Sequence, residues 1–419
     1  MENKVSLHLK LMSYLFISLP LLLITGPFLS DLAIVIICIL YLFNNFKKEI
    51  YEHLKNYVVI FFLFFYTLCI VSSLLSDYPL ISTLKSIFYI RFLIFALAIA
   101  YILKNKPDTL YKLFFSILIC FAILILDGFY QFIFKENIFG FKMYEARISS
   151  FFKDELVYGS YLSKFFPIFL SLFFILKKKT IYLNIFFSTI LIFSIFAITI
   201  SGERAALFLI VLTLSYLLIM LKLNYKILLT FFVIILLGIS SIVTLNNSIK
   251  DRMINFTKNQ IITKDKIYFF SKDHTGHYYA AIDIYKENNK IIGIGPKNFR
   301  NYCYNNQKYQ NSPFICSSHP HNTYIQILTE TGILGFLILL TSFFLLIYLS
   351  LRHFYFKLFK KEFKYSNFQI SLFAFYVMIL WPIVPTGNFF NNYLSIIYFI
   401  PLGLLIWSHK NQKLITFLK

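Results

Sequence analysis

Long runs of apolar residues, separated by short polar segments, recur along the whole chain. Each run is roughly 17–25 residues long, which as a helix is enough to cross a hydrocarbon layer about 30 Å thick. The runs lack the alternation of apolar and polar residues that is typical of barrel strands. The pattern therefore predicts an all-α integral membrane protein with about 12 transmembrane helices. The predicted spans are Leu11–Leu29, Leu32–Phe43, Tyr57–Leu75, Leu84–Leu103, Tyr111–Phe134, Leu156–Leu176, Ile181–Ile200, Ala205–Leu221, Ile227–Leu245, Gly332–Leu351, Phe368–Val384 and Tyr393–Ser408.

Composition supports this fold class and charge gives the orientation. Of the 419 residues, 58% are hydrophobic and only 14% are charged, which excludes an ordinary soluble domain. The net charge of +21 does not indicate a nucleic-acid partner, because the cations gather in alternate loops as the positive-inside rule expects. We therefore place the N-terminus inside and expect membrane lipid, not nucleic acid, around the chain. The inner cations are Lys47, Lys48, Lys55, Lys104, Lys106, Lys177, Lys178, Lys179, Lys222, Lys226, Arg352, Lys357, Lys360, Lys361, Lys364, Lys410 and Lys413.

One long polar loop interrupts the spans and divides the chain into three parts. Residues 1–245 form a bundle of about nine predicted helices, 246–322 form a large outer loop, and 323–419 hold about three more helices. Within the loop, the pattern predicts an amphipathic helix over Tyr278–Lys286 and a short helix over Asn298–Tyr304, joined by a tight turn at Gly293–Pro296.

The motif His319-Pro320-His321-Asn322 places imidazoles where the chain re-enters the membrane. Pro320 suits the first turn of a helix capped by Ser318 or His319. His321 would then lie at a helix N-terminus, where the dipole lowers its pKa and free N–H groups attract a phosphate. A neutral imidazole near pH 7 can act as a general base.

Two other interpretations of His321 remain open, a buried structural histidine and a metal ligand shared with His319. No carboxylate or cysteine is spaced to complete a metal site, so we expect no metal and no cofactor.

Two further segments present cations on the outer side. Arg204, in the short loop Ser201-Gly202-Glu203-Arg204, lies where the charge rule disfavours it, and its guanidinium suits bidentate capture of a diphosphate. The alternatives for Arg204 are a pair with Glu203 or with lipid headgroups. Gly293–Arg300 is a glycine turn followed by a basic helix, so Lys297 and Arg300 are candidates to bind an anion.

Three charged residues lie inside predicted spans. Arg91, Asp127 and Lys164 are each about two turns from the outer end of their helix, and charges at that depth need partners. We expect an ion pair around Asp127, with a packing role and a substrate role both open.

The sequence from His321 and Asn322 through nine residues to Gly332 and Gly335 follows a known pattern: His, then Asn, Ser or Gln, then nine residues, then Gly-x-x-Gly. This pattern resembles the O-antigen ligases and O-antigen polymerases of Gram-negative surface-polysaccharide assembly. The resemblance extends from about the third span onward. Further segments similar to that family are Ser201–Arg204, Gly293–Arg300 and, for polymerase-like relatives, Ser149–Tyr161.

The resemblance implies a GT-C-like, metal-independent glycosyl transfer on the periplasmic face of the bacterial inner membrane. The donor would be a glycan linked to undecaprenyl diphosphate, and the acceptor a lipid A-core or a second glycan. His321 would be the base, with Arg204 and Arg300 on the diphosphate. An arginine common before the loop helix of the family is replaced by His274-Thr275-Gly276-His277, so Arg300, His274 and His277 are the candidates for its role. The remaining expected substrate contacts are Asn322, His319, Lys297 and Arg91.

Two sister reactions fit these residues, ligation of O-antigen to the lipid A-core and polymerisation of its repeats. The spacing after His321 favours the ligase, whereas Asp154 and Glu155 favour the polymerase. A polysaccharide flippase is a rival from another class, and internal repeats, which we do not find, would mark it. A structural membrane subunit would leave the outer Arg and His residues unexplained.

Cysteine positions give a first testable prediction. Cys303 and Cys316 lie in the outer loop, where an oxidising compartment permits a disulfide, and closing this loop contributes about 3 kcal/mol in the chain-entropy model. Mass spectrometry of membranes prepared without reductant should find the two cysteines linked. Cys120, inside a predicted span, is the internal control and should be recovered as a thiol. Recovery of both loop cysteines as thiols would contradict the prediction.

Overall fold

The computed structural model describes residues 7–45, 56–176, 180–262, 267–310, 315–360 and 363–410. Within these ranges the chain is helical, and isolated bridges are its only β pairing. This confirms the all-α class. Of the basic residues used for orientation, Lys47, Lys48, Lys55, Lys177, Lys178, Lys179, Lys361 and Lys413 lie outside the described ranges.

The helices, in chain order, are α1 (Leu7–Thr25), α2 (Pro27–Asn45), α4 (Tyr57–Leu74), α5 (Pro79–Asn105), α6 (Thr109–Phe134), the 3-10 turn η1 (Ser150–Phe152), α7 (Tyr158–Ile175), α8 (Ile181–Ile200), α9 (Arg204–Met220), α10 (Tyr225–Leu245), α11 (Asn247–Lys250), the π turn η2 (Asp251–Asn255), α12 (Phe256–Ile261), α13 (Lys272–Glu287), α14 (Phe299–Tyr304), α15 (Gln307–Gln310), α16 (Thr323–Tyr355), the π turn η3 (Phe356–Lys360), α17 (Asn367–Ile379) and α18 (Asn392–Lys410).

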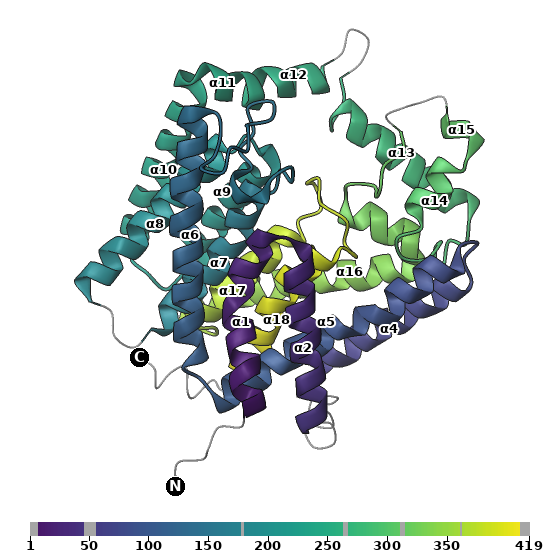
Figure 1. The fold of residues 1–419 in the computed structure, drawn as a ribbon, viewed down its shortest axis with the longest axis horizontal. Coiled ribbons are helices and arrows are strands. Elements are labelled where there is room, and N and C mark those ends of the chain that lie inside the picture. Colours follow the sequence, from purple (N-terminus) through teal and green to yellow (C-terminus); the bar gives the residue numbers. More distant parts are fainter. Residues whose placement is uncertain are drawn as a thin grey trace.

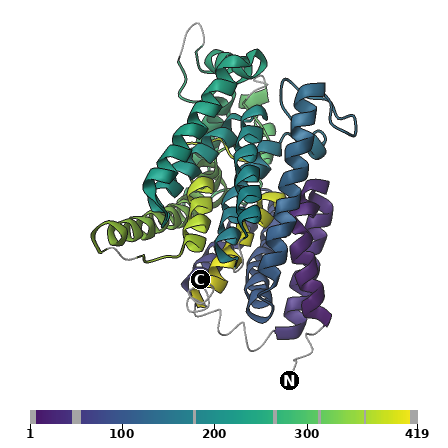
Figure 2. The same ribbon diagram turned by 90° about the vertical axis from the view of Figure 1, so that its left-hand side faces the viewer.

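The long helices form a bundle, and the short helices of the large loop form two groups: α11 and α12 lie above α9 and α10, and α13–α15 lie at the right, near α16 (Figure 1). We call the side of the bundle with these two groups the loop face. Within the bundle α5 packs against α18, α4 and α2, while α17 packs against α7 and α9. The view turned by 90° shows the same separation between the upright helices and the short helices above them (Figure 2). The large loop therefore covers one end of the bundle.

Nine helices of the described residues are long and apolar enough to cross a membrane, and three more, α2, α9 and α17, are apolar but shorter. The outward surfaces of these helices carry many exposed large apolar side chains, for example Phe64, Ile133 and Leu237. Such surfaces suit a hydrocarbon solvent and not water. The chain is a multi-pass membrane protein.

The first two predicted spans have the wrong boundary. The apolar pattern continued one helix through Leu29, whereas α1 ends at Thr25 and α2 begins at Pro27. Gly26 lies between them with φ +126, a conformation that L side chains rarely adopt, and Pro27 suits a first helical turn.

Helix α16 is divided by a kink at Gly332, where φ is 66° and ψ is −168°. The segment before the kink starts from Asn322, and the segment after it carries the long apolar run. The sequence predicted a helix that starts near Pro320 and a membrane span that starts at Gly332, so the helical turns before Gly332 were expected and the kink was not. The polar residues Gln326, Thr329 and Glu330 of these turns are fully buried, although an apolar count leaves them outside the span.

A turn of the large loop pairs with the backbone groups at this kink. The amides of Ile294 and Gly295 donate to the carbonyls of Thr329 and Glu330 at 3.1 and 2.8 Å, and the Ile333 amide donates to the Lys290 carbonyl at 2.9 Å. The approach is so close that a Cβ on Gly332 would lie 2.3 Å from the Ile291 oxygen. Gly332 is thus required twice, for its positive φ and for the space it leaves.

Gly332→Ala should destabilise the fold. We expect a loss of about 1–3 kcal/mol from backbone strain, with a further loss because the turn cannot dock. Thermal unfolding of the detergent-solubilised protein measures the effect. Gly140→Ala is the matched control, since Gly140 also has a positive φ, +83, but has nothing within 4 Å of an added Cβ. Equal stability losses in the two variants would contradict the role of the close approach.

Candidate active site

Four histidines from distant parts of the chain gather under the loop face. We call His274, His277, His319 and His321 the histidine cluster. The ring of His321 lies at its centre, with its centroid 4.0 Å from His319, 5.3 Å from His277 and 5.5 Å from His274. The expectation that these residues share one site is therefore met in their geometry, while their roles stay a prediction.

Helix α13 supplies His274 and His277. It begins earlier than predicted because Ser271 caps it, and the Ser271 hydroxyl also lies 2.6 Å from Nδ1 of His274. Nδ1 of His277 lies 2.9 Å from the carbonyl oxygen of Ile315. The next residue, Cys316, forms a disulfide with Cys303 of α14, across a Cα–Cα distance of 5.6 Å. The disulfide thus anchors the segment whose Ile315 carbonyl contacts His277.

The other two histidines, His319 and His321, are hydrogen-bonded to the loop between α17 and α18. The amide of Thr386 donates to the His321 carbonyl at 2.8 Å, and the Thr386 carbonyl lies 3.2 Å from Nε2 of His319. The Thr386 hydroxyl lies 2.9 Å from that of Thr323. In the described part of the chain nothing hydrogen-bonds the ring of His321 itself, so its nitrogens are available to a substrate.

The predicted cap of the following helix is wrong. Asn322, and not Ser318 or His319, caps α16, because its Oδ1 accepts from the amides of Tyr324 and Ile325 at 3.0 and 3.1 Å. Its Nδ2 donates to the Pro382 carbonyl at 2.8 Å. His321 precedes the cap with φ +59, so its side chain leaves the chain from a turn and not from the first helical residue.

Burial sets the protonation of the cluster. Desolvation, aided by the neighbouring histidines, lowers the pKa of His321 to about 3. Desolvation also lowers the pKa of His319 to about 4, against its bond to the Thr386 carbonyl. The sequence argument attributed the low pKa of His321 to a helix dipole, whereas burial is the main cause. Both rings are neutral at pH 7.

A second group, three arginines, lines a cavity beside the cluster. We call it the arginine cavity: it has a volume of about 510 Å³ and is lined by Arg147, Arg204 and Arg252, with His274 at one wall. Since His274 is also part of the histidine cluster, the cavity and the cluster adjoin. The loop after α17 contributes Val384 and Pro385 to the same wall.

Short helices of the loop orient two of the guanidinium groups. Arg204 donates to Oγ1 of Thr257 at 2.8 Å and to Oε1 of Gln260 at 2.7 Å, both on α12. The Cζ atoms of Arg204 and Arg252 lie 5.4 and 4.6 Å from the centroid of the Phe256 ring. Arg204 therefore lies where the sequence suggested, but its partners are on the large loop.

Glu203 takes a structural position next to these arginines. Its two carboxylate oxygens accept from the amides of Gly159 and Ser160 at 2.6 and 3.0 Å, at the start of α7. Burial raises the pKa of Glu203, and the charge of Arg147 opposes the shift. The alternative in which Glu203 pairs with Arg204 is not what the structure shows. Instead, Glu203 ties Ser201–Arg204 to the end of the segment Ser149–Tyr161.

Lys297 and Arg300 lie apart from the arginine cavity. The glycine turn docked on α16 carries Lys297, and α14 carries Arg300. Burial lowers the pKa of Lys297 to about 8, helped by the charges of Lys85, Arg300 and Arg91. Arg300 also contributes to the lowered pKa of His319, so it is electrostatically close to the cluster. Arg300 is not among the residues that line the arginine cavity, and its expected role on the same diphosphate as Arg204 stays a prediction.

The expected meeting of Arg91, Asp127 and Lys164 is wrong. Arg91 pairs with Asp31 of α2 at 2.8 Å. Asp127 accepts from the Ile138 amide at 3.1 Å and from the Ser150 hydroxyl, so it organises the loop after α6. Lys164 donates to the Ser160 hydroxyl. The three helices do not bring these charges together, and each charge has a local partner.

Three residues of the site were missed from the sequence: Arg147, Arg252 and Thr386. A signal existed for the two arginines, because both lie in outer segments where the charge rule disfavours them, as it does Arg204. The sequence offered no signal for Thr386, because threonine is common in loops. Among the described residues no group of three His, Cys, Asp or Glu side chains has the arrangement of a metal site.

A comparison with protein families agrees with these features. Residues 189–340 match the family model described as O-antigen ligase. The matched segment contains Arg204, Arg252, all of the histidine cluster and the kink at Gly332. It supports the assignment of this chain to the O-antigen ligase and O-antigen polymerase family, and so a ligase-type, glycosyltransferase-like function in lipopolysaccharide biosynthesis. No curated protein matches the chain.

The lowered histidine pKa values predict a loss of stability in acid. The unfolded chain takes up protons near the usual imidazole pKa of 6.5, whereas folded His319 and His321 resist until about 4 and 3. The contribution of these histidines to stability should therefore fall as the pH drops below 6.5, by up to about 1.4 kcal/mol per pH unit for each histidine, while the raised pKa values of buried Glu203 and Glu330 act in the opposite direction. Melting temperatures between pH 7 and 5 measure this slope.

His321→Asn should flatten that slope, and asparagine tolerates the positive φ of this position better than most residues. His8→Gln, at the exposed start of α1, is the control and should leave the slope unchanged. Equal pH dependence of the melting temperature in the wild-type protein and in His321→Asn would contradict the burial argument, because the carboxyl groups of Glu203 and Glu330 are the same in both.

Proposed function

We propose that this protein is an O-antigen ligase-type glycosyltransferase, which moves a polysaccharide from undecaprenyl diphosphate to a lipid A-core acceptor. The observation that carries the proposal is the contact between the histidine cluster and the arginine cavity. Nε atoms of Arg147 and Arg252 are buried and have no hydrogen-bond partner among the described residues. Buried donors of this kind call for an anionic partner, and a diphosphate suits guanidinium groups.

In the proposed mechanism, an acceptor hydroxyl attacks the anomeric carbon of the donor sugar. The bond from that carbon to the diphosphate oxygen breaks, and the diphosphate leaves with the electron pair. Neutral His321 takes the proton of the attacking hydroxyl. Arg204, with Arg147 and Arg252, offsets the charge that develops on the leaving diphosphate. A direct displacement of this kind inverts the anomeric carbon.

Arg300 was expected on the same diphosphate. We keep it in the site as a cation near His319, where it acts on substrate from the other side of the cluster. His274, His277 and His319 are proposed to surround the reacting groups. Asn322 is proposed to fix His321, since its side chain hydrogen-bonds the first turn of α16 and the Pro382 carbonyl.

The number of membrane spans and the orientation of the protein are part of the same proposal. If the three shorter apolar helices also span, the count is about twelve, as the sequence predicted for a GT-C-like arrangement. We place the loop face in the periplasm and the bundle in the inner membrane, because the described cations Lys104, Lys222 and Arg352 lie at or just beyond the C-terminal ends of α5, α9 and α16, whose starts contact the large loop. Residues 1–245, 246–322 and 323–419 then serve as N-terminal bundle, catalytic loop and C-terminal helices.

The polymerase reaction is the alternative, and the packing of Ser149–Tyr161 against Ser201–Arg204 favours it. Deleting the gene in its host and resolving the lipopolysaccharide on a gel distinguishes the two. A ligase defect leaves the core bare while long glycan accumulates on the polyprenyl carrier. A polymerase defect leaves single repeats on the core and no ladder. A bare core together with carrier-linked single repeats retained on the cytoplasmic side would instead indicate the flippase.

Removal of the His321 imidazole tests the mechanism. His321→Ala and His321→Asn should each lower transfer by about 10²–10⁴-fold, because the general base is lost. Asparagine suits the positive φ, so a normal melting temperature in that variant separates chemistry from folding. His409→Ala, at the exposed end of α18, is the matched control. Full activity in His321→Asn would overturn the assignment of the base.

A further inference from the structure

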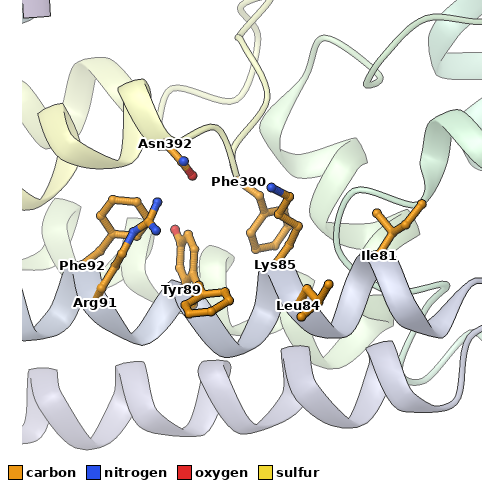
Figure 3. Close-up of a pocket in the computed structure, with 9 residues that line it drawn as sticks. Ile81, Leu84, Lys85, Tyr89, Arg91, Phe92, Phe390 and Asn392 are labelled. Carbon is orange, nitrogen blue, oxygen red and sulfur yellow. The ribbon is translucent and has the colours of Figure 1, made fainter. Parts of the chain in front are cut away.

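A second cationic cavity lies in the wall of the bundle, along α5. We call it the α5 cavity: it has a volume of about 360 Å³, and its polar lining residues include Lys85, Arg91 and Asn392. Figure 3 shows Lys85 and Arg91 rising from the same side of α5, with Asn392 opposite them at the start of α18. The aromatic rings of Tyr89 and Phe390 lie between these polar groups.

The rim of this cavity is apolar and exposed. Ile81, Leu84 and Phe88 have exposed fractions of 51%, 50% and 59%, and they recur at helical spacing beside Lys85. A cation surrounded by apolar side chains in a membrane wall suits a molecule with an anionic head and an apolar tail.

The cations of the cavity continue to the histidine cluster. Lys297 is within electrostatic range of Lys85 and Arg91, and Arg300 is within range of both Lys297 and His319. Asp31 neutralises Arg91, but among the described residues neither Lys85 nor Arg300 has an ion-pair partner. Like charges repel, so a line of cations persists most readily where an anion binds.

A direct displacement requires that the acceptor reach His321 from a different side than the donor diphosphate. In a direct displacement the nucleophile enters opposite the leaving group, so the acceptor cannot share the side of the donor diphosphate. The arginine cavity meets the cluster at His274, whereas the loop after α17 reaches from Phe390, in the lining of the α5 cavity, to Thr386, whose carbonyl lies 3.2 Å from Nε2 of His319. The α5 cavity is therefore on the side left for the acceptor.

We propose that the α5 cavity binds the phosphate or diphosphate group of the acceptor lipid, with Lys85 as its main contact and Arg91, Lys297 and Arg300 along the path to His321. The identification of the bound lipid as the acceptor rests on the proposed function. The presence of a second lipid-phosphate site, separate from the arginine cavity, can be tested without any transfer reaction.

Binding stoichiometry is the first test. Native mass spectrometry of the purified full-length protein with undecaprenyl diphosphate and lipid A should show one bound equivalent of each. Lys85→Gln should weaken lipid A binding about tenfold, and Arg252→Gln should weaken undecaprenyl diphosphate binding. Lys142→Gln, an exposed lysine in the loop between α6 and α7, is the matched control. A single equivalent that depends on Arg252 alone would overturn the proposal.

Phosphatidylglycerol is the second probe, because a bulk anionic phospholipid offers the same phosphate chemistry. It should not displace the equivalent that depends on Lys85. Displacement at similar concentrations would assign the cavity to ordinary membrane lipid and overturn the proposal. If His321→Asn proved fully active, the proposed mechanism would fail while this binding count could still succeed, so the two failures are distinguishable.

Kinetics assign the site to the acceptor. In a transfer assay, Lys85→Gln should raise the KM for the acceptor about tenfold without raising the KM for the donor, and Lys85→Arg should restore it. A rise in the donor KM alone, or no change in either KM, would overturn the assignment.

Discussion

The kink of α16 is the constraint on which the rest of the site depends. A helix that bends at membrane depth leaves backbone groups that must find partners, since hydrocarbon offers none. The turn Lys290–Gly295 supplies those partners and is thereby fixed to the helix. Because the turn docks there, Phe299 lies next to Glu330, and the Phe299 amide donates a hydrogen bond to Oε1 of Glu330 at 3.2 Å. One backbone irregularity thus places Lys297 and Arg300 on one side and the His321 turn at the other end of the helical segment.

Charge is divided between the two sides of the cluster. The arginine cavity is built from the loop after α6, the start of α9 and the loop helices, whereas the α5 cavity is built from two spans. Neutral histidines between two cationic regions avoid adding to the repulsion, which is consistent with the burial that lowers the pKa of His319 and His321. A proton accepted by His321 adds positive charge next to two cationic regions, and anionic substrates in those regions would offset that charge. The site is therefore suited to reactants that both bring negative charge.

The sequence was sufficient for what depends on local pattern. Apolar length located the long apolar helices, and the spacing from His321 to Gly335 indicated the family whose model matches residues 189–340. The sequence was insufficient where a residue's partner lies on another helix: Arg91 pairs with Asp31, and nothing in either segment identifies α2 as the neighbour of α5. The gathering of Arg147, Arg204 and Arg252 depends on the tertiary fold in the same way. The start of a helix near Pro320 could be predicted, but not the burial of Gln326 and Glu330, which hydrogen-bond to one another at 2.9 Å.

The disulfide between Cys303 and Cys316 ties the shape of the site to the chemistry of its surroundings. It anchors the segment whose Ile315 carbonyl holds His277, and such bonds form only where thiols are oxidised. A chain inserted with its large loop in a reducing compartment would keep both thiols and leave His277 without this anchor. The anchor of His277 is therefore complete only in copies whose large loop lies in an oxidising compartment.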